Sequence, residues 1–509
     1  MALGSICLLY ACLSATFIAA TASSREHNVV AVGEGGGGIK YRAAAYEHEP
    51  HQGLPVSRSG ALDIMMQNLA DFESATEAFS RAGTAQIIVF PEDGITGLLV
   101  SKMEFYAEPM PNLTRIVRQR VVPCAEAESA TATPVLRRLS CMAIKYGTVV
   151  VANMADKDVA TGHLYNTDVA FDTDGRLLMK YHKEHLFFEQ QFTPGSAHPE
   201  HAPVFRTSFG VTFGLCTCYD ILFPAPCQQN VLAHGATELA FPTAWMNAGP
   251  LLYSTGIQQS FSAMLGVNVI AANAHLPAFR FTGSGVYAAG GNPLQTYIER
   301  AGDPSISAKL LSADLVSGQA RHSAVAERLE PLPLVAMDST TAERFKAETP
   351  YKYEFLSRHA SSLEVCEGAF CCLVTYQFDN ATISSGLFGE HFALGVFNGT
   401  KPRQPVTFWA QTCAVIKCFD GLVSSCSNSS PTATVQSRFT HLSVSARFDK
   451  SVDETRLYPV VMTSGASLVD MATDVAVRRA AENVWSLRIK SPLAVSAVGF
   501  FAHPALTAR

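Results

Sequence analysis

Three side chains, each placed just beyond a run of strand-like residues, can together carry covalent acyl-transfer chemistry. Glu92 supplies a carboxylate, Lys183 an ammonium group and Cys218 a thiol. A thiol attacks a carbonyl carbon only after it loses its proton to a base, and a nearby cation stabilises both the thiolate and the oxyanion that follows. Because catalytic groups gather at the carboxyl ends of strands in α/β sheets, we expect these three groups to meet there.

The interpretation of Lys183 depends on strand alternation. On an extended strand over residues 177–183, Lys183 shares one face with the apolar residues at 177, 179 and 181, whereas Lys180 lies on the other face. We therefore expect the Lys183 ammonium to point inward and Lys180 to be solvated. The alternative for Lys183 is a surface lysine at a frayed strand end. For Glu92, the alternative is an ordinary turn residue.

Cys218 ends a strand predicted over residues 211–218 and precedes the polar pair Tyr219 and Asp220. This order is typical of a nucleophile on a sharp strand-to-helix turn, where the following backbone N–H can donate to an oxyanion. Cys216 lies two positions earlier, inside the predicted strand, and is interpreted as a buried structural cysteine.

Cysteine usage and the first residues indicate an oxidising compartment. An apolar stretch over residues 6–20 is followed by the small residues Ala20-Thr21-Ala22, which predicts a secretory signal over 1–22; the alternative, a membrane anchor, would need a longer apolar run. Of the 13 cysteines, Cys7 and Cys12 lie in this signal, so an odd number remains and at least one thiol is not paired within the chain. N-x-[ST] sequons predict glycosylation at Asn112, Asn380, Asn398 and Asn428.

The chain of 509 residues is long enough for two domains. Apolar strand-like and helical stretches alternate through the first part, including a helix over 58–81 that is followed by Gly83, and this pattern predicts an α/β fold. The last 150 or so residues hold several cysteines and many short β-branched runs, which predict an all-β, disulfide-stapled domain. Adjacent Cys371 and Cys372 are not expected to bond to each other. The predicted parts are 1–22 signal, 23–40 flexible segment, 41–317 catalytic domain, 318–360 linker and 361–509 C-terminal β domain.

Charge gives little support for nucleic-acid binding. The formal net charge is −6, with 38 Lys and Arg against 44 Asp and Glu, and no long basic run occurs. After the signal, no stretch is long and apolar enough to span a bilayer. We therefore expect a secreted, extracellular protein without a transmembrane segment.

A set of short segments occurs in a fixed order along the chain. They lie at 46–48 (Tyr-Glu-His), 90–95 (Phe-Pro-Glu-Asp-Gly-Ile), 138–143, 181–183 (Tyr-His-Lys), 218–223 (Cys-Tyr-Asp-Ile-Leu-Phe), 242–247 (Pro-Thr-Ala-Trp-Met-Asn), 282–285, 371–372 and 393–397. With these segments the chain resembles the nitrilase, or carbon-nitrogen hydrolase, superfamily, and more closely its biotinidase and vanin (pantetheinase) branch. The resemblance extends from about residue 40 to the end of the chain. Relative to this family, Cys216 is an extra thiol.

The resemblance implies a nitrilase-type α-β-β-α sandwich and a set of roles. Glu92 is implied as the general base, Lys183 as the stabilising cation, Cys218 as the nucleophile and Glu189 as a supporting carboxylate. The implied substrate-binding residues are Tyr219, Trp245 and Asn247. The substrate is expected to be a linear vitamin amide, either pantetheine, which yields pantothenate and cysteamine, or biocytin, which yields biotin and lysine. Different motifs favour each of the two.

The sequence also allows a metal site, a serine nucleophile or a non-enzymatic role. A metal site could use His182 with His185, or His198 with His201, but neither pair has a convincing third ligand. Ser284 lacks the spaced glycines of a serine nucleophile elbow. The main non-enzyme alternative is a secreted binding or structural protein that keeps the fold but has lost activity. We expect a monomer with a small-molecule amide substrate and without a metal ion or another cofactor.

Overall fold

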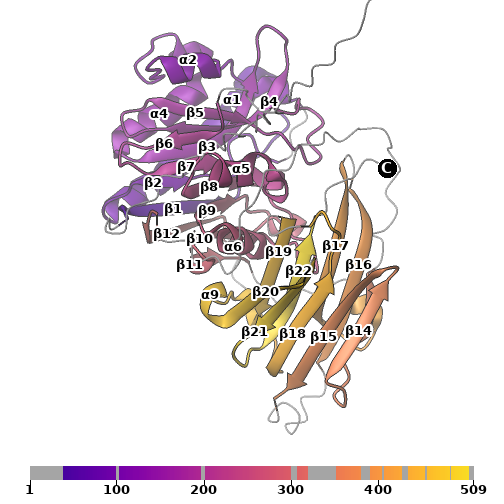
Figure 1. Cartoon of the computed structure of the whole chain (residues 1–509). Helices are drawn as coiled ribbons and strands as arrows, with labels where there is room; N and C mark the ends of the chain where they lie inside the picture. The colour runs from indigo at the N-terminus through magenta and orange to yellow at the C-terminus, as the bar shows by residue number, and fades with distance from the viewer. Residues whose placement is uncertain are drawn as a thin grey trace, which may run out of the picture. The chain divides into compact units, whose positions relative to one another are not determined.

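The computed structural model describes residues 38–98, 102–196, 201–299, 306–318, 351–379, 390–403, 406–426, 434–452, 456–481 and 483–503. These residues belong to one unit, whose helices and strands are labelled in Figure 1. The predicted signal at 1–22 and nearly all of the segment at 23–40 lie outside the described residues. No helix in the described ranges is both long and apolar enough to cross a membrane.

A first six-stranded sheet carries Glu92 and Lys183 at strand ends. Its parallel centre is formed by β1, β2 and β3, and β12, β4 and β5 extend it in antiparallel fashion. In spatial order its strands are β12 (Ala308–Val316), β1 (Lys40–His48), β2 (Ile87–Val89), β3 (Val149–Lys157), β4 (Leu164–Phe171) and β5 (Leu177–His182).

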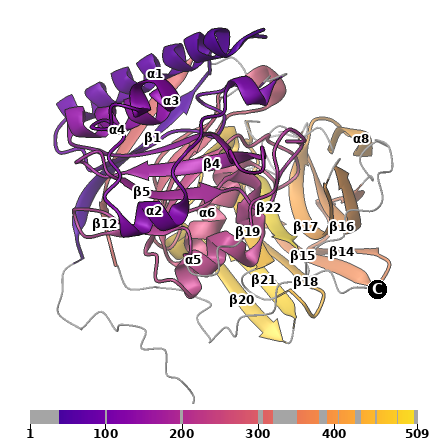
Figure 2. The same cartoon turned by 90° about the horizontal axis from the view of Figure 1, so that it is seen from above.

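Helices α1 (Arg58–Arg81) and α4 (Pro134–Tyr146) cover the outer face of this sheet (Figure 2). The bounds of α1 agree with the predicted helix. The Ser57 side chain accepts a hydrogen bond from the Gly60 N–H and so caps the helix start. Met65, Leu69 and Phe72 repeat at helical spacing and are buried against the sheet. The apolar period therefore determines which face of α1 is covered.

A second six-stranded sheet stacks on the first and carries Cys218. In spatial order its strands are β11 (Asn292–Tyr297), β10 (Ser284–Ala288), β9 (Asn268–Asn273), β8 (Glu238–Thr243), β7 (Thr212–Leu215) and β6 (Val204–Arg206). Helix α6 (Ser254–Leu265) packs on its outer face. Alternate residues of β1 show the layering, because Ala43 and Ala45 belong to the core between the sheets and Ala44 and Tyr46 face α1. The predicted α-β-β-α sandwich with a second, all-β domain is confirmed.

The C-terminal part is a sandwich of two five-stranded sheets around an apolar core that includes Trp485 and Phe500. One sheet contains β13 (Lys352–Phe355), β16 (His391–Arg403), β17 (Val406–Cys418), β22 (Val495–Ala502) and β19 (Leu457–Thr463). The other contains β14 (Ser362–Glu367), β15 (Phe370–Phe378), β18 (Phe439–Arg447), β21 (Val484–Ile489) and β20 (Val475–Ala481). All pairs in both sheets are antiparallel.

The predicted linker at 318–360 is too long at its C-terminal end. Lys352–Phe355 forms β13, which pairs with residues 393–396 of β16 and therefore belongs to the β domain. The segment is only four residues long and lacks a clear alternating pattern, so its strand depends on the partner that it meets. Residues 319–350 lie outside the described ranges.

Five disulfides staple the described chain, and three of them lie in the C-terminal domain. They join Cys124 to Cys141, Cys216 to Cys227, Cys366 to Cys371, Cys372 to Cys413 and Cys418 to Cys426. Among the described residues Cys218 is the one free cysteine, so the predicted odd thiol is confirmed. The neighbours Cys371 and Cys372 bond to different partners, as expected.

The β domain contacts the second sheet's outer layer close to the Cys218 segment. The Tyr458 hydroxyl of β19 donates to the Ile221 carbonyl oxygen at 2.7 Å. Gly256 in α6 faces Val460, and a Cβ at Gly256 would lie only 2.9 Å from the valine side chain. The shorter described helices are η1 (Met103–Phe105), α2 (Leu113–Arg118), α3 (Ser129–Ala132), η2 (Cys218–Leu222), η3 (Pro224–Gln228), α5 (Gln229–Leu232), η4 (Pro277–Phe279), α8 (Val423–Cys426), η6 (Ser464–Ala466) and α9 (Met471–Asp474).

Candidate active site

Cys218 sits at a sharp turn between β7 and the short helix η2. The strand ends at Leu215, three residues before the predicted end, and Cys218 is the first residue of η2. Its φ of 46° lies in the left-handed region, which is uncommon for a residue with a side chain and costs on the order of 1–3 kcal/mol. The thiol is 4 % exposed. The strained turn thus lies just beyond the carboxyl end of β7.

Glu92 is held by three different elements. It follows β2 after Phe90 and Pro91 and is 1 % exposed. Its Oε2 accepts the backbone N–H of Ala244 at 2.8 Å. Its Oε1 accepts the Lys183 Nζ at 2.6 Å and the Asn166 Nδ2 at 2.9 Å. These donors fix the carboxylate in one orientation.

Lys183 points inward, as strand alternation predicted, and is 2 % exposed. Its Nζ lies 2.6 Å from Glu92 Oε1 and 2.7 Å from Glu189 Oε2. Burial by itself would lower the pKa of Lys183, but the charges of Glu189 and Glu92 outweigh burial and hold that pKa well above its usual value. The side chain is therefore an ammonium ion clamped between two carboxylates.

The electrostatic surroundings keep the Cys218 thiol protonated at rest. Burial raises the pKa of the thiol well above its usual value, and the Glu92 carboxylate raises it further, whereas the Lys183 ammonium lowers it. The charges of Glu92 and Lys183 therefore both act on the Cys218 sulfur.

A buried polar network supports the carboxylates, and the sequence analysis missed most of it. Asn166 Nδ2 donates to both Glu92 and Glu189, and Asn166 Oδ1 accepts from Asn153 Nδ2 at 2.6 Å. The same Asn153 amide reaches Asp168 at 2.8 Å, and Asp168 accepts the Thr217 hydroxyl at 2.7 Å. The available signal was the polar side chains at 166 and 168 in an otherwise buried strand.

Glu189, the predicted supporting carboxylate, also accepts the Phe187 backbone N–H at 2.9 Å. Burial raises the pKa of Glu189, although Lys183 and this N–H lower it. Asp93 adjoins the same group, and burial together with the charges of Glu92 and Glu189 raises its pKa well above the usual value.

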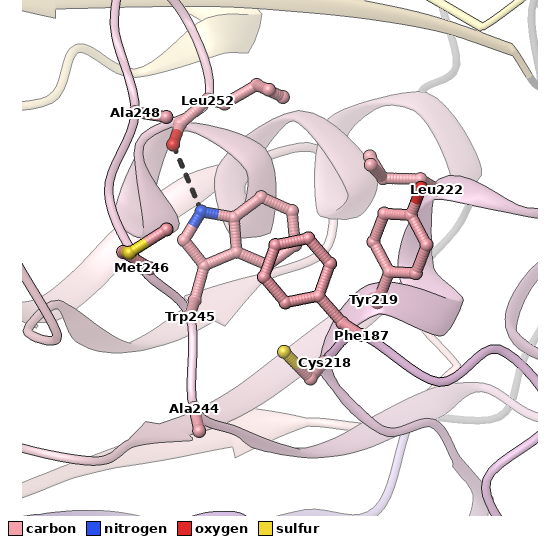
Figure 3. Close-up of a pocket in the computed structure, with 9 residues that line it drawn as sticks. All are labelled: Phe187, Cys218, Tyr219, Leu222, Ala244, Trp245, Met246, Ala248 and Leu252. Atoms are coloured by element: carbon pink, nitrogen blue, oxygen red, sulfur yellow. Dashed lines mark hydrogen bonds between the residues drawn. The ribbon is translucent and has the colours of Figure 1, made fainter. Parts of the chain in front are cut away.

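An apolar cavity opens beside the Cys218 sulfur. In Figure 3 the rings of Phe187, Tyr219 and Trp245 gather around this sulfur, and the Trp245 Nε1–H donates to the Leu252 carbonyl oxygen at 3.0 Å. No charged side chain is among the nine residues drawn there. The lining residues are Phe187, Cys218, Tyr219, Leu222, Ala244, Trp245, Met246, Ala248 and Leu252. Two of the three predicted substrate-binding residues, Tyr219 and Trp245, thus lie in the wall.

Comparison with known proteins identifies the family. A model described as carbon-nitrogen hydrolase matches residues 57–263, and one described as vanin C-terminal domain matches residues 342–491. Pantetheinase of Mus musculus is 33 % identical over 445 residues, which cover 84 % of this chain and 82 % of that protein. Biotinidase of Takifugu rubripes is 33 % identical over 462 residues, which cover 84 % of this chain and 87 % of that protein. The chain is a carbon-nitrogen hydrolase of the pantetheinase and biotinidase branch.

This membership confirms the resemblance on which the sequence analysis relied, and it makes the chain a hydrolase of carbon–nitrogen bonds. Among solved structures, an amidase from Nesterenkonia matches with a TM-score of 0.40 and 23 % identity, covering 55 % of this chain and 92 % of that one. Saccharomyces cerevisiae Nit3, a member of branch 10 of the nitrilase superfamily, matches with a TM-score of 0.43 and 21 % identity, covering 55 % and 90 %.

One prediction about an individual residue of the hydrolase needs correction, and another is borne out. Asn247 is not among the residues that line the cavity. Its side chain forms hydrogen bonds with the backbone instead: Nδ2 donates to the Thr282 carbonyl oxygen at 2.8 Å, and Oδ1 accepts the Ser254 N–H at 2.8 Å. Cys216, an extra cysteine relative to the family, is bonded to Cys227. Its interpretation as a buried structural cysteine is confirmed.

Three carboxylates of the hydrolase, Glu92, Asp93 and Glu189, lie close enough together to share a cation. The Lys183 ammonium already contacts two of them and supplies positive charge at this point. The donor set otherwise consists of hard carboxylate oxygens, which favour Mg²⁺ or Ca²⁺ over zinc.

The residues considered for rival chemistries have other partners. His182 pairs with Asp156 at 2.8 Å, and His185 pairs with Asp220 at 2.8 Å. The Ser284 hydroxyl donates to the buried Glu47 carboxylate at 2.7 Å, so it is part of a structural network. His198 lies outside the described residues.

The predicted glycosylation sites fall into two groups. Asn112 is exposed and caps α2, where its Oδ1 accepts the Arg115 N–H at 2.8 Å. Asn398 is half-buried in β16, and its Oδ1 accepts from Gln411 Nε2 at 3.2 Å. Asn380 and Asn428 lie outside the described residues. Glycosylation remains a prediction at each of these positions.

Proposed function

We propose that this enzyme hydrolyses linear amides with an uncharged acyl group through a thioester on Cys218. The observation that carries the proposal is the position of the free thiol within the field of a clamped Glu92–Lys183 pair, beside an apolar cavity. The five disulfides leave no other described cysteine available for nucleophilic attack.

In the proposed reaction, Glu92 accepts the thiol proton while the Cys218 sulfur attacks the amide carbon. The new oxyanion is stabilised by the Lys183 ammonium and by the backbone N–H of Tyr219. The C–N bond then breaks, and the amine departs with the proton returned from Glu92. Water, activated by Glu92, attacks the thioester, which releases the acid and restores the thiol.

The cavity supports the substrate class. Its aromatic and aliphatic walls exclude water from the acyl group, and the absence of a charged side chain among the lining residues disfavours a charged acyl group at this depth. Relatives named pantetheinase and biotinidase direct attention to two amides, pantetheine and biocytin, whose acyl groups are both uncharged.

Purified enzyme should be incubated with each amide, and pantothenate or biotin measured by mass spectrometry. We expect Cys218→Ala and Glu92→Gln to abolish turnover of the preferred amide. The matched control is Glu126→Gln, which neutralises a surface glutamate and should leave turnover unchanged. Hydroxylamine should trap the acyl group from wild-type enzyme alone. Turnover by Cys218→Ala would overturn the proposal, and an unreactive thiol with no product from either amide would favour a binding role.

We further propose that the enzyme is secreted. The predicted signal over 1–22 supports this, and so do the five disulfides, which form and persist mainly in oxidising compartments. Expression of the full chain in eukaryotic cells should yield protein in the medium that begins after residue 22. Its mass should fall on treatment with an N-glycosidase. Retention of the product inside the cells would contradict the proposal.

A further inference from the structure

Thr243 places a hydroxyl group at the end of β8, beside the candidate nucleophile. Along β8, Leu239 and Phe241 face away from the core between the sheets and belong to the apolar cluster that contains Cys218. Strand alternation puts Thr243 on the same face, two residues beyond Phe241. The row of apolar side chains therefore ends in a hydroxyl that faces the cluster containing the sulfur.

The Thr243 hydroxyl is buried and uncommitted. The side chain is 0 % exposed, and its Oγ1 makes no aligned hydrogen bond to any atom of the described chain. Native proteins seldom bury a hydroxyl in this state, because burial removes its bonds to water. The hydroxyl nevertheless acts on the Cys218 sulfur and lowers the pKa of that thiol, as does the Ala244 N–H. The hydroxyl thus acts on the sulfur, although no hydrogen bond joins the two groups in the described chain.

Two other donors that act on the sulfur, the Ala244 N–H and the Lys183 ammonium, have carboxylate partners. The Ala244 N–H donates to Glu92 at 2.8 Å, and the Lys183 ammonium is held by Glu92 and Glu189. A neutral thiol is a weak acceptor, whereas a thiolate attracts an O–H donor strongly. Catalytic hydrogen bonds that are poorly aligned in the empty enzyme often tighten when charge develops.

We propose that the Thr243 hydroxyl donates a hydrogen bond to the Cys218 sulfur as the thiolate forms, which makes Thr243 a further catalytic residue. The proposal rests on the role of Cys218 as nucleophile. No bond is made or broken by Thr243, because its proton stays on oxygen throughout. The hydroxyl stabilises the thiolate that attacks and the thiolate that leaves when the thioester is hydrolysed.

The test compares Thr243→Val, which keeps the shape but removes the hydroxyl, with Thr243→Ser, which keeps the hydroxyl. The matched control is Thr255→Val, because Thr255 in α6 also carries a buried hydroxyl without a partner in the described chain but does not line the cavity. Two quantities should be measured: kcat/KM, and the pH dependence of Cys218 alkylation by iodoacetamide, followed as the mass of the Cys218 peptide.

We expect Thr243→Val to lower kcat/KM about tenfold, as expected for one charge-assisted hydrogen bond, and to move the alkylation midpoint to higher pH. Thr243→Ser should restore most of both values, and Thr255→Val should match wild type. If Thr243→Val does not fold, Thr243→Ala provides a second hydroxyl-free variant, and thermal unfolding identifies the folded one.

The outcomes separate this proposal from the proposed function. If Cys218→Ala is inactive and wild-type Cys218 is alkylated, but Thr243→Val keeps the wild-type pH profile and kcat/KM, only the role of Thr243 is overturned. An equal fall in Thr243→Val and Thr243→Ser would also overturn it, since packing would then be the cause. If Cys218→Ala retains turnover, the nucleophile assignment fails and both proposals fall.

Discussion

Glu238, a carboxyl group buried at the start of β8, predicts how the stability of the enzyme depends on pH. Its side chain is 0 % exposed and accepts a hydrogen bond from the Tyr41 hydroxyl. Burial raises the pKa of Glu238 from 4.5 to about 8, although hydrogen bonds with Tyr41 and Asn268 lower it. The folded enzyme therefore keeps this proton up to about pH 8, whereas the unfolded chain releases it near pH 4.5.

The difference between the folded-state and unfolded-state pKa of Glu238 sets the sign and the size of the change in stability with pH. A group whose pKa is higher in the folded state stabilises the fold fully below its unfolded pKa, and the contribution is lost as pH rises through the folded pKa. One pKa unit corresponds to about 1.4 kcal/mol, so the loss between about pH 4.5 and pH 8 amounts to roughly 5 kcal/mol. Glu238→Gln has no proton to release and should not show this loss.

The assay is thermal unfolding of wild type and Glu238→Gln at pH 5 and pH 8. We expect the Tm of Glu238→Gln, relative to the Tm of wild type, to rise by roughly 10 °C from pH 5 to pH 8. The reason is that 1 kcal/mol shifts the Tm of a larger domain by about 2–4 °C. Glu77→Gln, which neutralises an exposed carboxylate of α1, is the control and should follow wild type. Because Glu238 lies at the end of β8 opposite Thr243, Glu238→Gln should keep wild-type kcat/KM. Parallel pH curves for wild type and Glu238→Gln would refute the reasoning.

Three further predictions concern the site and its support. Asn166→Leu should lower kcat/KM by about 10- to 100-fold, because a hydrogen bond to a charged group contributes about 1.5–3 kcal/mol, and it should also lower thermal stability, because two buried carboxylates lose a donor; unchanged steady-state kinetics would contradict this. Cys216→Ala with Cys227→Ala should keep most turnover at low temperature but lose about 2–4 kcal/mol of stability in denaturant unfolding, and loss of turnover in folded protein would point to a wrong nucleophile. Tyr458→Phe should cost about 1 kcal/mol of stability, measured in the same way, because its hydroxyl bonds to the backbone beside η2; no loss would show that this contact adds nothing.

Elements around the site could be predicted from the sequence where the local pattern of apolar residues matches the burial pattern in the structure. The helix at Arg58–Arg81 was predicted with the bounds that the structure has, because its apolar period and its stop at Gly83 are local features. The inward face of Lys183 followed from alternation along β5, whose burial alternates residue by residue. By contrast, β7 ends at Leu215, three residues before the predicted end, and Cys216 beyond it is bonded to Cys227 in η3, a pairing that no local pattern predicts.

The support around the catalytic groups was not predictable, because it depends on register between strands. Asn153 of β3 lies opposite Asp168 of β4 only through the antiparallel pairing of those strands. The Ala244 N–H donates to the Glu92 carboxylate although the two residues are 152 positions apart in the sequence. No local sequence pattern predicts that a particular backbone N–H will make such a contact. The same reason explains the error at Asn247, whose side chain has backbone partners that sequence alone does not place beside it.

The sequence by itself determined which chemical groups are available and that an odd cysteine must remain. It could not tell how the other cysteines pair, because a disulfide needs two cysteines that approach closely in space, usually to a Cα separation of about 4.4–6.8 Å. The tertiary structure decided this when it brought Cys216 and Cys227 to a Cα separation of 5.2 Å and left Cys218 free. It also decided the charge states, because the Lys183 ammonium persists in a buried position only where Glu92 and Glu189, from other parts of the chain, surround it.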